Sequence, residues 1–108
     1  MFMDKDKIYI EEIKDFCRKI IAFTEGLSYE DFVGDEKLQL AVVKLIENVG
    51  EASKRLSEST RANYPGVDWN KALAMRNKLV HEYMEVDLSI VFDVAMKEIP
   101  ALLKSLDR

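Results

Sequence analysis

The chain has 108 residues and a mass of 12.5 kDa, with 48% hydrophobic and 33% charged residues. This length predicts one domain over residues 1–108 and excludes a two-domain enzyme, and the composition excludes a disordered chain. The formal net charge of −4 argues against a protein that coats nucleic acid non-specifically.

Glycine and proline are scarce, with four and two residues. Small β-sandwiches and barrels need frequent turns, so an all-α fold is expected. The single cysteine, Cys17, cannot form an internal disulfide, and the N-terminus lacks a basic stretch followed by a long apolar run. No apolar run is long enough to span a membrane. These features predict a cytoplasmic protein that does not enter a membrane.

The first predicted helix extends from about residue 5 to Gly26. Its apolar residues recur every three or four positions, as in an amphipathic helix. The predicted stripe contains Tyr9, Ile13, Phe16, Ile20, Phe23 and Leu27, widened by Ile10, Cys17 and Ile21. Small polar residues interrupt the period over 28–35, so the helix ends before them.

Three further helices are expected, each beginning at an aspartate. Asp35, Asp68 and Asp87 are placed as caps, because a carboxylate accepts hydrogen bonds from the free amides of a first helical turn. The second helix is expected to end near Glu58, and the third to extend from Trp69 to about 83. A turn is predicted between them, at Asn63-Tyr64-Pro65-Gly66.

The fourth helix contains Pro100, which removes one helical hydrogen bond, so a bend is predicted near Ile99. Short connections between long amphipathic helices favour an antiparallel four-helix bundle. The second helix has an additional apolar strip, formed by Leu40, Val43 and Gly50. This strip fits either a dimer interface, where Gly50 admits another backbone, or the interior of one small bundle.

The third predicted helix carries an arginine in the middle of its apolar arc. The arc contains Trp69, Ala72, Leu73, Leu79, Val80 and Tyr83. A buried unpaired guanidinium is costly, so Arg76 must have an acidic partner, reach solvent or line a wet cleft between subunits. The ordinary interpretation is a structural ion pair, with Glu51 or Asp31 as the kind of partner to expect.

The same helix contains residues suited to phosphodiester cleavage. Arg76 supplies a permanent planar charge for a phosphate, His81 ionises near neutral pH, and Asn77 can orient the imidazole. Taken singly, His81 is more often a surface residue and Tyr83 more often a core aromatic. The sequence has no metal-ligand cluster and no phosphate-binding glycine loop, so any chemistry is expected to need neither metal nor cofactor.

Residues 76–83, with the sequence Arg-Asn-Lys-Leu-Val-His-Glu-Tyr, resemble the signature of HepT-like toxins within the HEPN superfamily of small helical ribonucleases. The resemblance extends over essentially the whole chain. It includes Tyr29-Glu30-Asp31-Phe32, Val49-Gly50-Glu51-Ala52, Trp69, Asp87 and Pro100. At position 74 this chain has alanine where many relatives have glycine, and this difference puts no catalytic residue in doubt.

This resemblance implies an RNA endonuclease toxin of a type VII toxin–antitoxin module. HEPN ribonucleases are homodimers whose site combines residues of both subunits. That agrees with the spacing here, since Arg76 and His81 are five residues apart, or about 140° around one helix. The implied catalytic residues are Arg76 and His81, assisted by Asn77.

The resemblance also implies control by a partner. The family's antitoxin, MntA, is a minimal nucleotidyltransferase that transfers AMP to the tyrosine of the motif, which corresponds to Tyr83. An alternative is a non-catalytic dimer that serves as the binding partner of such a transferase, and a further one is a helical scaffold without a ligand.

Overall fold

The structure is a computed structural model that describes residues 5–79 and 87–107. These residues form α-helices and a π-helical turn, with no β-strand among them, so the all-α expectation is confirmed. The elements are α1 (Lys5–Thr24), α2 (Tyr29–Val33), α3 (Glu36–Lys54), α4 (Glu58–Ala62), α5 (Trp69–Leu79), α6 (Leu88–Asp93), the π-helical turn η1 (Val94–Glu98) and α7 (Ile99–Leu106). None of the described helices combines the length and apolar character needed to cross a membrane.

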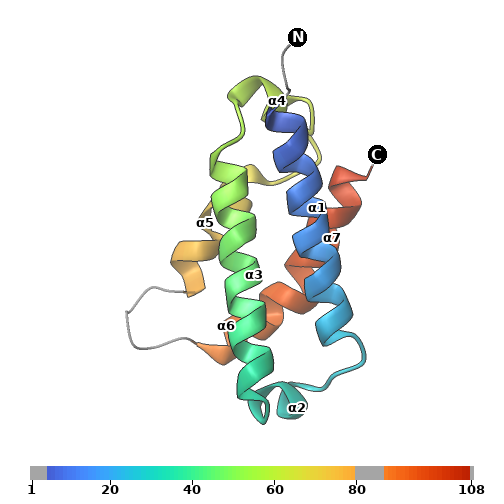
Figure 1. The fold of residues 1–108 in the computed structure, drawn as a ribbon, viewed down its shortest axis with the longest axis vertical. Coiled ribbons are helices and arrows are strands. Elements are labelled where there is room, and N and C mark those ends of the chain that lie inside the picture. The colour runs from blue at the N-terminus through green and yellow to red at the C-terminus, as the bar shows by residue number, and fades with distance from the viewer. Residues whose placement is uncertain (1–4, 80–86, 108) are drawn as a thin grey trace.

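The long helices form a bundle around α1 and α3. Figure 1 shows these two helices side by side and running in opposite directions, with α2 at the end of the molecule where the chain reverses. α5 contacts α3 on one side, and α7 contacts α1 on the other. α3 is therefore the element that joins the central pair to α5, which carries the first half of the motif.

The core is centred on α1 and α3 and is completed by buried residues of α5, α6, η1 and α7. The buried residues of α1 recur at spacings of three and four, and the fully buried residues of α3 include Val42, Ile46 and Val49. In α1 the buried residues are Ile10, Ile13, Cys17, Ile20 and Thr24. The predicted apolar stripe is displaced from this buried row. Phe23, which belongs to the predicted stripe, is 46% exposed, whereas Cys17, which is predicted at the side of the stripe, is fully buried.

The predicted helix caps are confirmed. The side chain of Asp35 accepts a hydrogen bond from the Leu38 amide at 3.0 Å. Asp68 accepts one from the Lys71 amide at 3.1 Å, and Asp87 accepts from the amides of residues 89 and 90. Each carboxylate satisfies amides that have no partner within the first helical turn.

The second long helix is shorter than predicted. α3 ends at Lys54 rather than near Glu58, and Ser57 begins the separate helix α4. The Ser57 hydroxyl accepts a hydrogen bond from the Thr60 amide. The hydroxyls of Ser57 and Thr60 both donate to the carboxylate of Asp6. Periodicity alone misses this break, because the polar residues that cause it bind an aspartate distant in sequence.

The irregularity predicted in the last helix is a π-helical turn directly before Pro100. The Ile99 amide donates to the carbonyl of Val94, five residues earlier. A proline ring excludes the carbonyl four residues before it, so a wider turn at this point relieves the clash. Val94 and Ala95 are buried, and η1 contacts α1. The turn therefore belongs to the core.

Cys17 provides a test of this core. It has no exposed surface, and burial raises the pKa of its thiol to about 12. Because the thiolate is the reactive form, we expect a thiol reagent at mildly alkaline pH to modify Cys17 only when the chain unfolds. The labelling rate should rise with denaturant in parallel with the loss of helical circular dichroism.

The Ala22→Cys variant is the matched control, since position 22 is exposed on the same helix. Its added thiol should react at once in the native protein. Equal labelling rates for Cys17 and the added thiol under native conditions would contradict the buried position.

Candidate functional site

The described part of the motif lies at the end of α5. Arg76 and Asn77 are in the last turn and a half of this helix, and both are exposed. His81 and Tyr83 lie outside the described residues. The structure therefore places Arg76 and Asn77, and the positions of the other two residues stay predictions.

The apolar face of α5 fixes the direction in which Arg76 points. Ala72, Met75 and Leu79 are buried at helical spacing, so this face packs on α3. The predicted arc is confirmed for Ala72 and Leu79, but it omitted Met75. Arg76 was expected in the middle of the arc and instead lies at its edge, where its side chain is 53% exposed. Its charge is therefore accessible to a ligand.

The start of α5 is fixed by the indole of Trp69. Its Nε1 atom donates a hydrogen bond to the carbonyl of Arg61 at 2.9 Å, and its ring packs edge-on against Tyr64. These contacts join α5 to α4 and to the turn before it. The helix that carries Arg76 is thus held both at its first residue and along its buried face.

Gly50 lets α3 approach α5 beside Arg76. A Cβ atom at this position would be 3.3 Å from the Arg76 Cβ and 3.5 Å from its backbone nitrogen. The expectation that Gly50 admits a second backbone is confirmed, but that backbone is α5 of the same chain. Of the two alternatives for the strip of Leu40, Val43 and Gly50, the interior of one bundle therefore holds for Gly50, whereas Leu40 is 65% exposed.

Glu51 is the acidic partner of Arg76. The Nε atom of Arg76 is 3.4 Å from Oε1 of Glu51, and the Glu51 side chain is 44% exposed. Of the two expected partners, Glu51 is confirmed. An ion pair this exposed contributes at most about 1 kcal/mol to stability, so it is not needed to hold α5 in place.

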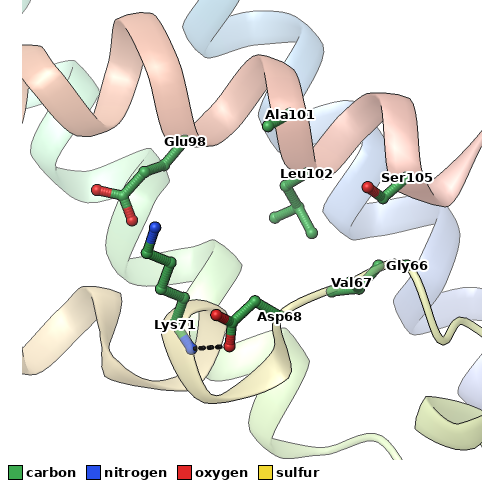
Figure 2. Close-up of a pocket in the computed structure, with 8 residues that line it drawn as sticks. All are labelled: Gly66, Val67, Asp68, Lys71, Glu98, Ala101, Leu102 and Ser105. Carbon is green, nitrogen blue, oxygen red and sulfur yellow. Dashed lines mark hydrogen bonds between the residues drawn. The ribbon is translucent and has the colours of Figure 1, made fainter.

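Two hollows in the described surface lie away from Arg76. One, of about 160 Å³, lies between the turn at 66–68 and α7, where Lys71 and Glu98 point toward one another (Figure 2). The other, of about 270 Å³, lies beside Asp6 and Tyr64. Over 5–79 and 87–107, no group of three or more His, Cys, Asp or Glu side chains is placed to hold a metal.

The geometry suits the recognition of a phosphate. Arg76 is a solvent-accessible guanidinium on a helix that two sets of contacts fix, and its contact with Glu51 is made through Nε. A guanidinium presents two terminal nitrogens beyond Nε, and these can bind two oxygens of one phosphate. Asn77 adds an exposed amide at the neighbouring position.

The sequence profile of the family described as ribonuclease HepT-like matches residues 9–108. A protein of Caldanaerobacter subterraneus subsp. tengcongensis with a provisional RNase name is 39% identical over 102 residues, covering 94% of this chain and 91% of that protein. A Thermococcus cleftensis protein named probable ribonuclease HepT is 35% identical over 96 residues, covering 89% and 87%. No solved structure matches the chain significantly.

The close approach at Gly50 predicts the effect of a larger residue there. In Gly50→Leu, the side chain meets Arg76, and overpacking of this kind costs about 1–3 kcal/mol. This exceeds the gain in helix propensity, which is about 0.8 kcal/mol. We expect a lower free energy of unfolding in urea for Gly50→Leu, with Lys44→Ala, at an exposed position of the same helix, close to wild type. Unchanged stability in Gly50→Leu would contradict the contact.

Proposed function

The chain belongs to the HepT-like ribonuclease family, and from that premise we propose that it is a metal-independent RNA endonuclease in which Arg76 binds the scissile phosphate. Family membership makes the chain a ribonuclease, so its substrate class is RNA. The observation that supports the role of Arg76 is its position. It is the first residue of the motif, and it is exposed on a helix that α3 and Trp69 hold in place.

The proposed reaction is attack of an RNA 2′-hydroxyl on the adjacent phosphorus. A bond forms between O2′ and phosphorus while the bond from phosphorus to O5′ breaks, which leaves a 2′,3′-cyclic phosphate and a 5′-hydroxyl. His81 takes the proton from the 2′-hydroxyl or gives one to the leaving oxygen. Arg76 stabilises the negative charge that develops on the phosphoryl oxygens, and Asn77 orients His81 or binds one of these oxygens.

The site is proposed to be shared by two chains of a homodimer. On one regular helix, Arg76 and His81 project about 140° apart, so two facing helices aim both groups at one phosphate more readily than one helix does. The exposure of Arg76 supports this arrangement, because a group at the surface of α5 is accessible to a second copy. Gly50 already contacts α5 of the same chain, so the dimer interface would use α5 and exposed residues such as Leu40.

Substitution of the two charged motif residues tests the proposed chemistry. We expect Arg76→Ala and His81→Ala each to lower RNA cleavage by about 10²- to 10⁴-fold, because loss of a group that stabilises transition-state charge or of a positioned acid or base has an effect of this size. Both should leave the helical circular dichroism unchanged. A chelator should have little effect on the wild-type rate.

Lys97→Ala is a suitable control, since it removes one exposed cation on η1. Its cleavage rate should equal that of the wild type. Cleavage that survives in both Arg76→Ala and His81→Ala would contradict the assignment.

Control of the enzyme is proposed to act at Tyr83. In this proposal the protein is the toxin of a type VII toxin–antitoxin module in the cytoplasm, and an MntA-like nucleotidyltransferase transfers AMP from ATP to the Tyr83 hydroxyl. Tyr83 is seven residues after Arg76, so on a continuous helix it would lie almost directly above it. The added phosphate would then compete with RNA for the guanidinium.

Tyr83→Phe should retain most RNA cleavage and escape inactivation by the transferase, because it loses only the acceptor hydroxyl. Tyr29→Phe is the matched control, since Tyr29 is 42% exposed and lies on α2. It should be inactivated like the wild type. Mass spectrometry after incubation with the transferase and ATP should locate AMP on Tyr83.

AMP on another residue, or silencing of Tyr83→Phe by the transferase, would refute this assignment. A wild-type protein that accepts AMP but never cleaves RNA would instead support the non-catalytic partner of a nucleotidyltransferase.

A further inference from the structure

Glu51 approaches the guanidinium of Arg76 at its Nε atom. The contact joins Oε1 to Nε at 3.4 Å. The two terminal nitrogens lie beyond Nε and form the end of the guanidinium that grips a phosphate. A carboxylate bound to those nitrogens would compete with RNA, whereas a carboxylate at Nε restricts the rotation of the side chain and leaves its end open.

Both members of this ion pair come from rigid backbone. Glu51 lies between Gly50, which touches α5, and Ala52, which is 3% exposed. Arg76 follows Met75, which is also 3% exposed and packed into the core. The only freedom left is in the two side chains, and each has several rotatable bonds. A contact between them therefore selects one orientation of the guanidinium from many.

The small stabilising energy of the ion pair between Glu51 and Arg76 also favours a role in orienting the guanidinium. Both side chains are about half exposed, so water screens their attraction and the pair adds little to the stability of the fold. The separation of 3.4 Å is longer than a strong hydrogen bond, so the pair limits the direction of the guanidinium without binding it tightly.

We infer that Glu51 is a positioning residue, which holds the guanidinium of Arg76 by Nε so that the terminal nitrogens face the RNA phosphate. This inference rests on the proposed function, because it assumes that Arg76 binds the phosphate during cleavage. Glu51 itself does not touch the substrate. It reduces the number of side-chain conformations that Arg76 loses when the transition state forms.

The test compares Glu51→Ala with Glu51→Gln in RNA cleavage by the full chain. Glu51→Ala removes the contact, and kcat should fall by about 10- to 100-fold, since misplacement of a catalytic group has effects of this size. KM should change by less than about threefold, because the remaining contacts with RNA are intact. Glu51→Gln keeps a side chain of the same length with an oxygen that can face Nε, so it should restore kcat to within about threefold of the wild type.

Asp93→Ala is the matched control, because it removes a half-exposed carboxylate at the end of α6, which pairs with Lys97 one turn later rather than with Arg76. It should cleave RNA like the wild type. Thermal melts of all variants should agree with the wild type, which separates positioning from a loss of fold.

Three results would overturn the positioning role. They are an unchanged kcat in Glu51→Ala, an increase in cleavage in either Glu51 variant, which would make Glu51 a competitor of RNA, and an equal loss in Glu51→Ala and Glu51→Gln. Arg76→Ala is measured beside them. If it cleaves like the wild type, the proposed function fails. If it is inactive while Glu51→Ala is unchanged, only the positioning role fails.

Discussion

The contact between α3 and α5 at Gly50 determines how the candidate site is built. Because glycine has no side chain, the two helices approach until the backbone of Gly50 lies against the Cα–Cβ region of Arg76. Two consequences follow from the same contact. The next residue on α3, Glu51, comes within reach of the guanidinium, and α5 packs Met75 and Leu79 into the core. A larger residue at position 50 would disturb both.

The sequence predicted the helices well because their signals are local. Aspartate caps and apolar spacing act within a few residues, so Asp35, Asp68 and Asp87 could be identified without knowledge of the fold. The irregularity before Pro100 was predictable for the same reason, since the proline lies in the same helix. The break after Lys54 was missed because the residues that follow it form hydrogen bonds with Asp6, which is distant in sequence.

The candidate site was predictable in composition and less so in arrangement. The need of Arg76 for a partner followed from the cost of an unpaired charge, and Glu51 was one of two named possibilities. Periodicity could not decide what covers Gly50, since an apolar strip is the same whether its partner is the same chain or another. It also places Arg76 too deep, because the predicted arc lacks Met75, whose burial shifts the centre of the buried face.

Asp6 joins the first turn of α1 to the connection that leads to α5. Its carboxylate accepts a hydrogen bond from the Ser57 amide, 51 residues along the chain, and others from the hydroxyls of Ser57 and Thr60. Those hydroxyl hydrogen bonds lower the pKa of Asp6 below its ordinary value of 3.8. The stabilisation is therefore present above that ordinary value, and it is lost only as the pH falls through the lowered pKa.

A hydrogen bond between residues so distant in sequence closes a large loop, and the entropic cost of closing it is offset only where other contacts already hold the ends of the loop together. The antiparallel packing of α1 on α3 does this, because it brings the start of α1 to the end of α3. Asp6 then ties α1 to α4, and the Arg61 carbonyl of α4 accepts the hydrogen bond from Trp69 that holds the start of α5. The placement of Arg76 is thus linked, through a short series of contacts, to the first turn of the first helix.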